Sequence, residues 1–488
     1  MRWAAALMLA GAPAVAQPAF EDRSAGLPMH VYGGGWEHFV GGGVAVFDCN
    51  GDTLPDMFAA GGENPAKLFR NTGDFTFADA AVVEMTGVTG AYPLEINGDG
   101  NMDLFVMRVG RNRLLMGDGA CGFSEGDPLP PSDRWTTAFS AWWDANDRLV
   151  MAVGNYVDRA DPDGPFGACD DNFLITHTAD DFTATPLTPG YCPLSMLAAR
   201  DARGRMTLRF SNDRHYYVSE GHEQMWDIAE ARFLGPEDGW QNVSLWGMGI
   251  ASRDLTGDGR DEVMLTSMGD QLLQIAQDDG TYVAAPYSIG TYAQRPHTGD
   301  DGRPSTGWHA ELADVDNDGR ADLFIAKGNV DQMPGLAMQD PNNLLMQQGD
   351  GTFAEFGETA GIATKHRSRG AALADFDRDG RLDLVVMNRR APMEIYRNIT
   401  PDTGQWLRIA LLQDGANKHA IGAAVTVKTD AGMQSQQVVV GGGHAGGQAQ
   451  PLHFGLGNAA VNSVQVTWPD GMQTDHAVTV GQTNTLTR

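Results

Sequence analysis

Residues 311–328 read ELADVDNDGRADLFIAKG and place four aspartates, Asp314, Asp316, Asp318 and Asp322, within nine positions. Apolar residues typical of β-strands flank this acidic run on both sides. At an effective dielectric constant of about 20, two like charges ~5 Å apart repel by roughly 3 kcal/mol, so the loop resists closing unless a cation lies inside it. The stretch therefore predicts a metal-binding turn between two strands.

The acidic loop recurs along the chain, as DCNGDTLPD at 48–56, EINGDGNMD at 95–103, DLTGDGRDE at 254–262 and DFDRDGRLD at 375–383. Two further copies, around Asp144 and Asp201, keep the strand residues but lose the acidic spacing. Successive loops are separated by 47 residues (Asp48 to Glu95) to 61 residues (Asp314 to Asp375). This period predicts seven similar structural units.

Each unit reads as four short strands with Gly/Asp turns between them. Four-stranded sheets repeated around a ring are typical of a β-propeller, whose closure protects the sheet edges. The seventh unit ends at 393–400 without its fourth strand, and residues 20–23, FEDR, resemble the missing strand. We therefore expect an all-β fold, a seven-bladed β-propeller over residues 17–401, in which residues 20–23 complete the last blade.

The C-terminal region alternates apolar and polar residues over several strands and contains the turn Pro469-Asp470-Gly471. This pattern predicts a small β-sandwich over residues 402–488.

Residues 1–16 contain one arginine, an apolar run and the sequence Ala14-Val15-Ala16, which predicts a secretory signal cleaved after Ala16. No later stretch approaches the ~20 apolar residues of a membrane-spanning helix. The expected product is exported, either periplasmic or secreted, without a transmembrane segment. The net charge of -29 argues against nucleic acid as a partner, because basic patches supply that affinity.

The four cysteines can form disulfides in an oxidising compartment. Cys169 and Cys192 flank one Pro/Gly-rich stretch and are the favoured pair. Cys49 with Cys121 and free buried thiols remain alternatives.

The loop spacing suits Ca²⁺, which takes six to eight oxygen ligands from alternate positions of a short loop. Positions 1, 3, 5 and 9 carry the acids or amides, and glycine at position 6 suits a tight turn, whereas the flanking strands exclude an EF-hand. Metal-free Asx turns are the alternative, because Asp and Gly favour turns anyway. Up to five Ca²⁺ sites are predicted. Their ligands are Asp48, Asn50, Asp52 and Asp56; Glu95, Asn97, Asp99 and Asp103; Asp254, Asp258 and Glu262; Asp314, Asp316, Asp318 and Asp322; and Asp375, Asp377, Asp379 and Asp383.

The loops at Asp314 and Asp375 keep the full pattern and should bind Ca²⁺ most tightly. The other three depart from it, for example with Thr53 at position 6 of the first loop and Thr256 at position 3 of the fifth. Affinity follows ligand charge and rigidity, so these three should be weaker. The loops at Asp144 and Asp201 are expected to be empty.

The acidic repeats resemble the FG-GAP/VCBS-type repeats of integrin α-subunit propellers and of many secreted bacterial proteins. The C-terminal sequences AIGAAVTVKT (420–429), PLHFGLG (451–457) and VNSVQVTWPDG (461–471) resemble the ASPIC/UnbV domain. The combination is similar to the cartilage acidic protein family and implies a calcium-dependent, extracellular binding or adhesion role with no set activity. One departure is Gly447, where the family pattern has serine, which leaves the role of segment 442–448 open.

The segments that enter each first strand should lie around the central channel, on the face opposite the acidic loops. They carry aromatic and basic residues that a ring would bring together. We hypothesise a ligand site there, with flat indole platforms and His/Arg groups that orient an anionic or polar ligand. Packing that closes the channel is the alternative. The residues concerned are Trp36, His38, Trp246, Trp308, His309, His366 and Arg369.

The sequence therefore favours a calcium-binding propeller that binds an extracellular protein, a glycan or a small polar ligand. A propeller enzyme acting on polysaccharide or another extracellular substrate is one alternative, although no catalytic motif such as GxSxG or HExxH occurs and no catalytic residue is assigned. A purely structural surface or matrix protein is the other.

Overall fold

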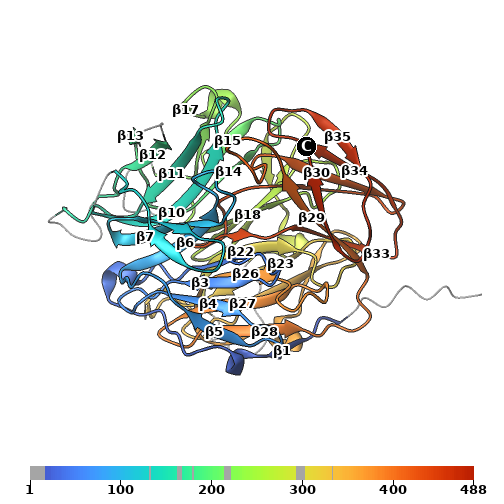
Figure 1. Cartoon of the computed structure of the whole chain (residues 1–488), viewed down its shortest axis with the longest axis horizontal. Coiled ribbons are helices and arrows are strands. Elements are labelled where there is room, and N and C mark those ends of the chain that lie inside the picture. The colour runs from blue at the N-terminus through green and yellow to red at the C-terminus, as the bar shows by residue number, and fades with distance from the viewer. Residues whose placement is uncertain are drawn as a thin grey trace, which may run out of the picture.

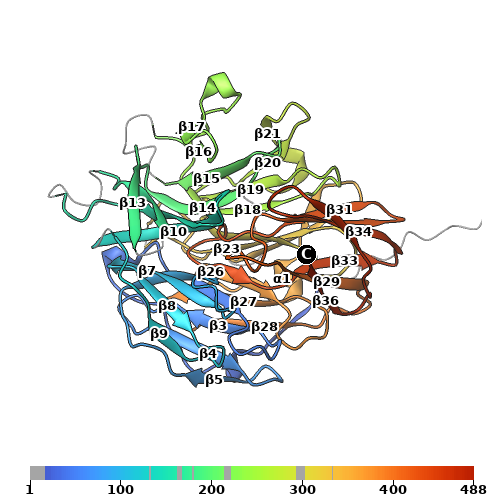
Figure 2. The same ribbon diagram turned by 45° about the horizontal axis from the view of Figure 1, so that its top comes forward.

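The structure is a computed structural model that describes residues 17–130, 133–161, 168–177, 181–213, 221–292, 303–331 and 333–488. The predicted signal, residues 1–16, lies outside these ranges. The described residues form seven four-stranded antiparallel units, followed by one three-stranded and one four-stranded sheet (Figures 1 and 2). The predicted all-β fold, a seven-bladed propeller followed by a β-sandwich, is confirmed.

The seven blades follow one another along the chain. Their strands are β2 (Val44–Phe47), β3 (Asp56–Ala59), β4 (Lys67–Asn71) and β5 (Phe77–Ala80) in blade 1; β6 (Val88–Leu94), β7 (Asp103–Gly110), β8 (Arg113–Gly117) and β9 (Phe123–Glu125) in blade 2; β10 (Arg134–Trp143), β11 (Leu149–Asn155), β12 (Asn172–His177) and β13 (Phe182–Leu187) in blade 3; β14 (Pro193–Arg200), β15 (Met206–Asn212), β16 (Gln224–Asp227) and β17 (Arg232–Phe233) in blade 4; β18 (Gly247–Arg253), β19 (Glu262–Ser267), β20 (Leu272–Ala276) and β21 (Tyr282–Ala284) in blade 5; β22 (Gly307–Ala313), β23 (Asp322–Lys327), β24 (Asn343–Gln347) and β25 (Phe353–Glu355) in blade 6; and β26 (Arg367–Ala374), β27 (Asp383–Arg389) and β28 (Glu394–Asn398) in blade 7.

The N-terminal strand closes the ring, as the sequence predicts. Strand β1 (Phe20–Asp22) pairs antiparallel with β28, so that Phe20 lies opposite Asn398. Blue β1 and orange β28 accordingly lie side by side at the bottom of Figure 1. Blades 1 and 7 also share a core, in which the rings of Phe77 and Phe376 meet edge to face at 5.9 Å. Backbone hydrogen bonds between β1 and β28, together with buried aromatic contacts between blades 1 and 7, therefore hold the ring closed.

Helices are few and short among the described residues. They are the 3₁₀ turns η1 (Ser24–Gly26), η2 (Trp36–His38), η4 (Pro236–Asp238) and η5 (Tyr287–Ile289), and the single turn α1 (Gly357–Ala360). The inner strands are apolar on both faces, as in β2 and β6, where every residue is buried. Such strands pack against a neighbouring blade on each side.

The C-terminal domain contains two sheets that face each other across a core around Leu407, Val425, Phe454 and Trp468. One sheet has the order β33-β29-β36 and the other β31-β30-β34-β35. Their strands are β29 (Gln405–Leu412), β30 (Ala424–Thr429), β31 (Met433–Gln437), β33 (Leu452–Gly457), β34 (Val461–Thr467), β35 (Gln473–His476) and β36 (Thr483–Thr487).

A loop of this domain, residues 440–449, enters the centre of the propeller, and we call it the plug. Its last two residues, β32 (Gln448–Ala449), pair in parallel with β2 of blade 1. The plug also forms single β-bridges to Ala91, Ala141, Leu197 and Ile250, on the innermost strands of blades 2 to 5. In blade 6, His309 Nδ1 accepts a hydrogen bond from the backbone N–H of His444 at 3.1 Å.

Glycines on both sides make this insertion possible. A Cβ added to Gly90 would lie 1.6 Å from the carbonyl oxygen of Ala445, which no side chain could tolerate. A Cβ added to Gly447 would lie 2.4 Å from the ring of Tyr92. Tyr92 donates its hydroxyl to the carbonyl of Gly442 at 2.9 Å. The departure from serine at position 447 therefore makes room for Tyr92.

Candidate metal loops and the channel

The acid at position 9 of each loop holds the hairpin together. In the sixth loop, Asp322 accepts hydrogen bonds from the backbone N–H groups of Val315 at 3.0 Å and of Gln347 at 2.9 Å. The carboxylates of Asp56, Asp103 and Asp383 make the same pair of bonds in their own blades. Position 9 thus ties the loop to the third strand, a role that the sequence reasoning had assigned to metal binding alone.

The glycine predicted at position 6 is required by the backbone. Gly319 and Gly380 have φ angles of 95° and 86°, in the left-handed region that favours glycine. Thr53 occupies this position in the first loop with a φ of 70°, a conformation that costs free energy for a β-branched residue. The first loop is therefore the most strained of the five acidic copies in this respect.

The sixth loop holds a carboxylate that protein groups leave unsatisfied. Asp316 is 1% exposed, and neither of its carboxylate oxygens has a hydrogen-bond partner. Ligand oxygens of Asp314, Asp316 and Asp322 all lie within 4.8 Å of one another. Burial and the neighbouring Asp318 carboxylate raise the pKa of Asp316 to about 6. Buried charges need a partner, so this geometry suits a bound cation.

Position 5 of this loop does not converge with the other three. The Asp318 carboxylate forms an ion pair with Arg320, two residues further on. The same pairing joins Asp258 to Arg260 at 2.5 Å, and Asp379 to Arg381. The repeated D-x-R pattern thus turns position 5 toward arginine.

The seventh loop, which the sequence ranks with the sixth, differs from it. Oxygens of Asp375, Asp377 and Asp383 also lie within 4.8 Å of one another. Arg408 of β29, however, reaches Asp375 at 2.5 Å in a buried ion pair, and Arg397 reaches Asp377 at 2.7 Å. Two guanidinium groups therefore already compensate this loop.

The two loops expected to be empty contain an arginine of their own. Arg205 Nη2 lies 2.7 Å from Asp201 Oδ2, and Arg148 Nη2 lies 2.6 Å from Asp144 Oδ2. In both cases the arginine follows the aspartate by four residues and bonds through Nε as well. A fixed guanidinium thus stands where other copies present a cluster of acids.

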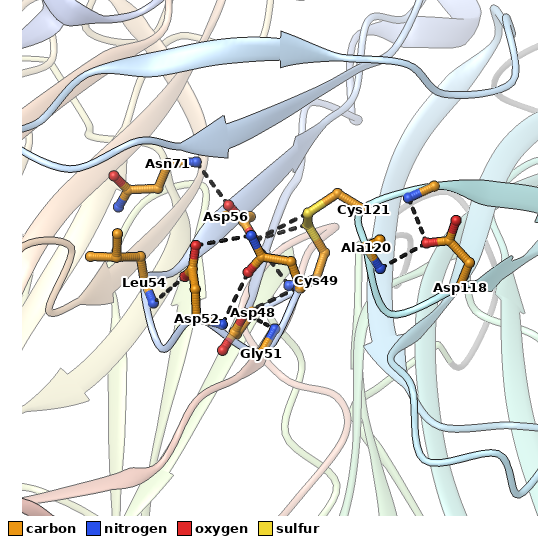
Figure 3. The surroundings of a disulfide bond; sticks show 12 residues. Asp48, Cys49, Gly51, Asp52, Leu54, Asp56, Asn71, Asp118, Ala120 and Cys121 are labelled. Carbon is orange, nitrogen blue, oxygen red and sulfur yellow. Dashed lines mark hydrogen bonds between the residues drawn. A yellow bond between two sulfur atoms is a disulfide. The ribbon is translucent and has the colours of Figure 1, made fainter.

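The first loop is joined to blade 2 by the disulfide Cys49–Cys121 (Figure 3). Asp56 lies beside this disulfide and bonds the N–H groups of Cys49 and Asn71. Asp52 accepts from the N–H of Leu54 at 2.8 Å, an Asx turn without metal. The favoured pair Cys169–Cys192 forms as well and is confirmed, so the alternative of free thiols is wrong.

The second and fifth loops each keep one unpartnered buried carboxylate oxygen. These atoms are Glu95 Oε2 and Glu262 Oε1. Burial raises the pKa of Glu95, and the nearby Lys418 ammonium of the C-terminal domain partly offsets this. Burial also raises the pKa of Glu262 to about 7. Among the described residues, neither loop gathers three carboxylates as the sixth does.

The C-terminal domain covers these loops. Backbone N–H groups of Ala416 and Asn417 donate to Asp147, and that of Gly457 donates to the Asn317 carbonyl. A cavity of about 800 Å³ remains between the domain and the loops, lined among others by Asp48, Glu95 and Lys418.

Three of the residues hypothesised to bind ligand lie together in the channel but are buried. They are Trp308, His309 and Arg369, at 0–4% exposure. The Arg369 guanidinium lies 3.9 Å from the centre of the Trp308 ring and donates to the carbonyls of Phe39 and Val330. The His444 ring of the plug lies 5.0 Å from Trp308. Protein groups therefore surround these three side chains.

The other four hypothesised residues lie apart from that cluster in different surroundings. Trp36 is 43% exposed and packs against Phe39 at 4.5 Å, whereas His38 is buried. Trp246 is half-buried, and its carbonyl accepts the Met268 N–H. His366 is exposed and lies 3.6 Å from Glu394. Of the seven residues, Trp36 and His366 are the ones with exposed side chains.

Sequence comparisons agree with this division of the chain. A model of the FG-GAP-like repeat matches residues 48–106, 254–325 and 314–386, and a model described as ASPIC and UnbV matches residues 413–488. The chain carries FG-GAP-like repeats and an ASPIC/UnbV domain. The repeat matches omit the loops at Asp144 and Asp201, which have lost the acidic spacing and pair their aspartate with an arginine.

Similar proteins from human and mouse are named cartilage acidic protein 1. The human and mouse proteins are each 28% identical over 178 residues, or 36% of this chain. The match spans about a quarter of those relatives' own length, 26% and 27%.

Solved propeller structures are less similar in sequence. The BP39L lectin from Burkholderia pseudomallei is 11% identical, with a TM-score of 0.48 over 74% of this chain and 96% of that chain. Sqt1 from Saccharomyces cerevisiae is 10% identical, with a TM-score of 0.42 over 76% of this chain and all of that one.

Proposed function

We propose that this protein is an exported, calcium-binding propeller whose role is to bind an extracellular protein, a glycan or a small polar ligand. The observation that carries the calcium proposal is Asp316. A buried carboxylate without partners is costly, and beside Asp314 and Asp322 it gains most from a hard divalent cation. We rank the sixth loop first, the second and fifth next, and the first and seventh last.

Export is proposed from two features. Two disulfides, typical of oxidising compartments, join blade 1 to blade 2 and blade 3 to blade 4. Among the described residues, no helix has the length and apolar character needed to cross a membrane.

Calorimetric titration with Ca²⁺ tests the calcium proposal. After chelation and dialysis, wild-type protein should bind Ca²⁺ saturably, and Asp316→Asn should lose the tightest site. Asp201→Asn is the matched control, because its loop already contains Arg205. It should leave the titration unchanged. An unaltered isotherm for Asp316→Asn would contradict the assignment, and absence of binding to wild type would remove the proposal.

The structural-protein alternative is favoured by the plug. Residues 440–449 pair with the innermost strands of several blades, and these contacts stabilise the propeller itself. A screen of glycans and metabolites separates the alternatives. Saturable binding supports a binding protein, turnover supports an enzyme, and neither supports a scaffold.

A further inference from the structure

Three arginines converge on one aspartate at the rim of blade 7. Asp331 Oδ1 lies 2.8 Å from Arg389 Nη1, 3.3 Å from Arg390 Nη1 and 3.8 Å from Arg367 Nη1. A single carboxylate cannot satisfy three guanidinium groups, each of which has five N–H donors. The cluster therefore keeps unused donors and positive charge.

Among the described residues, Asp331 is the acid that forms ion pairs with these three arginines. Arg369 lies beneath, fully buried, and its guanidinium donates only to carbonyls in the described structure: those of Phe39, Ser368, Asn329 and Val330. Two further acids of the described structure lie nearby: Glu63 accepts the N–H of Gly35 at 2.8 Å, and Glu37 forms an ion pair with Arg159 at 2.6 Å. Among the described residues, Arg367, Arg389 and Arg390 therefore share the single carboxylate of Asp331, in a chain with a net charge of -29.

Part of the cluster is held rigidly and part is accessible. Arg389 is 1% exposed, its Nε has no partner, and its Nη2 donates to the carbonyl of Gly34 at 3.1 Å. Arg390 donates to the same carbonyl at 3.2 Å, while its side chain is 44% exposed. A fixed inner guanidinium beside an exposed one is an arrangement suited to bidentate recognition of an oxyanion.

An exposed aromatic residue follows, in the chain, the backbone groups that Arg389 contacts. The carbonyl oxygens that accept from Arg389 belong to Gly34 and Gly35, and Trp36 follows directly in the chain. Trp36 is 43% exposed, and Phe39 and Trp135 pack against its ring. An indole held in place beside charged donors offers an apolar face on which a sugar ring can stack.

We propose that Arg367, Arg389 and Arg390, with Trp36, form a binding site for an acidic saccharide, whose carboxylate or sulfate group meets the arginines. This inference deepens the proposed binding role and rests on it, but it requires no metal in the acidic loops. The site lies beside the buried Arg369 cluster rather than within the plugged channel. Arg389 and Arg390, which complete it, are not among the residues that the sequence singled out.

Calorimetry on the calcium-loaded full chain tests this with glucuronate, glucose 6-sulfate, glucose and sodium sulfate. We expect the two acids to bind at least about tenfold more tightly than glucose, because a charge-assisted pair is lost with the neutral sugar. The stronger of the two acids identifies the oxyanion. Equal affinity for glucose and both acids overturns the proposal, and so does equal affinity for sodium sulfate and the acids.

Two variants with one control locate the site. Arg390→Ala should weaken binding of the preferred acid about tenfold, and Trp36→Ala should weaken the sugar acid but not sulfate. Arg70→Ala, at an exposed arginine of β4, should have no effect. Arg390→Lys tests whether binding depends on two parallel hydrogen bonds from the guanidinium, because lysine keeps the charge but cannot make such a pair. Unchanged affinity in Arg390→Ala overturns the assignment.

A parallel Ca²⁺ titration keeps the two proposals distinguishable. If the acids fail to bind while Ca²⁺ binds, this inference alone falls. If Ca²⁺ fails to bind while Arg390→Ala still weakens the acids, the calcium proposal alone falls.

Discussion

The sixth and fourth loops descend from the same repeat pattern but compensate their acids differently. The sixth loop gathers Asp314, Asp316 and Asp322 and leaves Asp316 without a protein partner. The fourth loop retains Asp201 and pairs it with Arg205 at 2.7 Å. The seventh loop lies between them, because its cation Arg408 comes from another domain. A hairpin of this kind therefore needs a positive charge. An arginine of the same loop, an arginine of another domain or a bound cation can supply it.

The largest expected loss of stability comes from removing Arg408, the arginine of the C-terminal domain that pairs with Asp375. Arg408→Ala should lower the free energy of unfolding by about 3 to 5 kcal/mol without Ca²⁺, because it leaves Asp375 buried and unpaired. Chemical denaturation measures this. Added Ca²⁺ should restore part of the loss, so that the variant gains more from Ca²⁺ than the wild type does. A loss that Ca²⁺ leaves untouched would mean that Arg408 and a metal ion do not substitute for one another.

Chelation should act on the sixth loop. A cation present at ~100 times its dissociation constant adds about 2.7 kcal/mol per site to the stability of the folded protein. EGTA should therefore lower the melting temperature of wild type, measured by calorimetry, and have a smaller effect on Asp316→Asn. An identical response of the two proteins would contradict the comparison.

Lowering the pH tests a buried group outside the acidic loops, the His444 side chain of the plug. Burial, followed by the charges of Arg369 and His309, lowers the pKa of His444 in the plug to about 3. The unfolded chain binds a proton near the ordinary value of about 6.5, so stability is full above that pH and is lost as pH falls toward 3. Between pH 6.5 and 5 the loss should be about 2 kcal/mol. His444→Gln should lose less over this interval in denaturant titrations, and an equal loss would contradict the prediction.

The smallest effect is expected in the fourth loop. Arg205→Ala removes an ion pair in which the arginine is one-third exposed, and should cost about 1 kcal/mol. The reduction in the denaturation midpoint should be the same with Ca²⁺ and with EGTA, because Asp201 and Asp227, the two carboxylates that Arg205 leaves behind, do not form a three-carboxylate cluster like that of the sixth loop. A calcium-dependent difference would show that the emptied loop has regained a metal site.

The plug shows where sequence reasoning stops. The glycine-rich run GGGHAGG at 441–447 permits close backbone approach, but the sequence does not indicate which strands it approaches. The structure supplies Ala91, Leu197 and Ile250, each from a different blade. For the same reason, Trp308 and Arg369 read as ligand groups, although the plug and the neighbouring carbonyls bury them.

The sequence by itself determined the seven blades, the completion of blade 7 by residues 20–22, the glycine at position 6 and the acidic hairpins. The acidic hairpins and the glycine at position 6 have local causes, whereas the blades and the pairing of residues 20–22 with β28 follow from the period of the repeat. Tertiary structure alone decided which cation faces Asp375 of the seventh loop, because Arg408 lies 33 residues from Asp375 in the chain yet forms a buried pair with it. Tertiary structure also decided that the plug of the C-terminal domain fills the propeller channel. Contacts between segments distant in the chain produce no periodic pattern in the sequence.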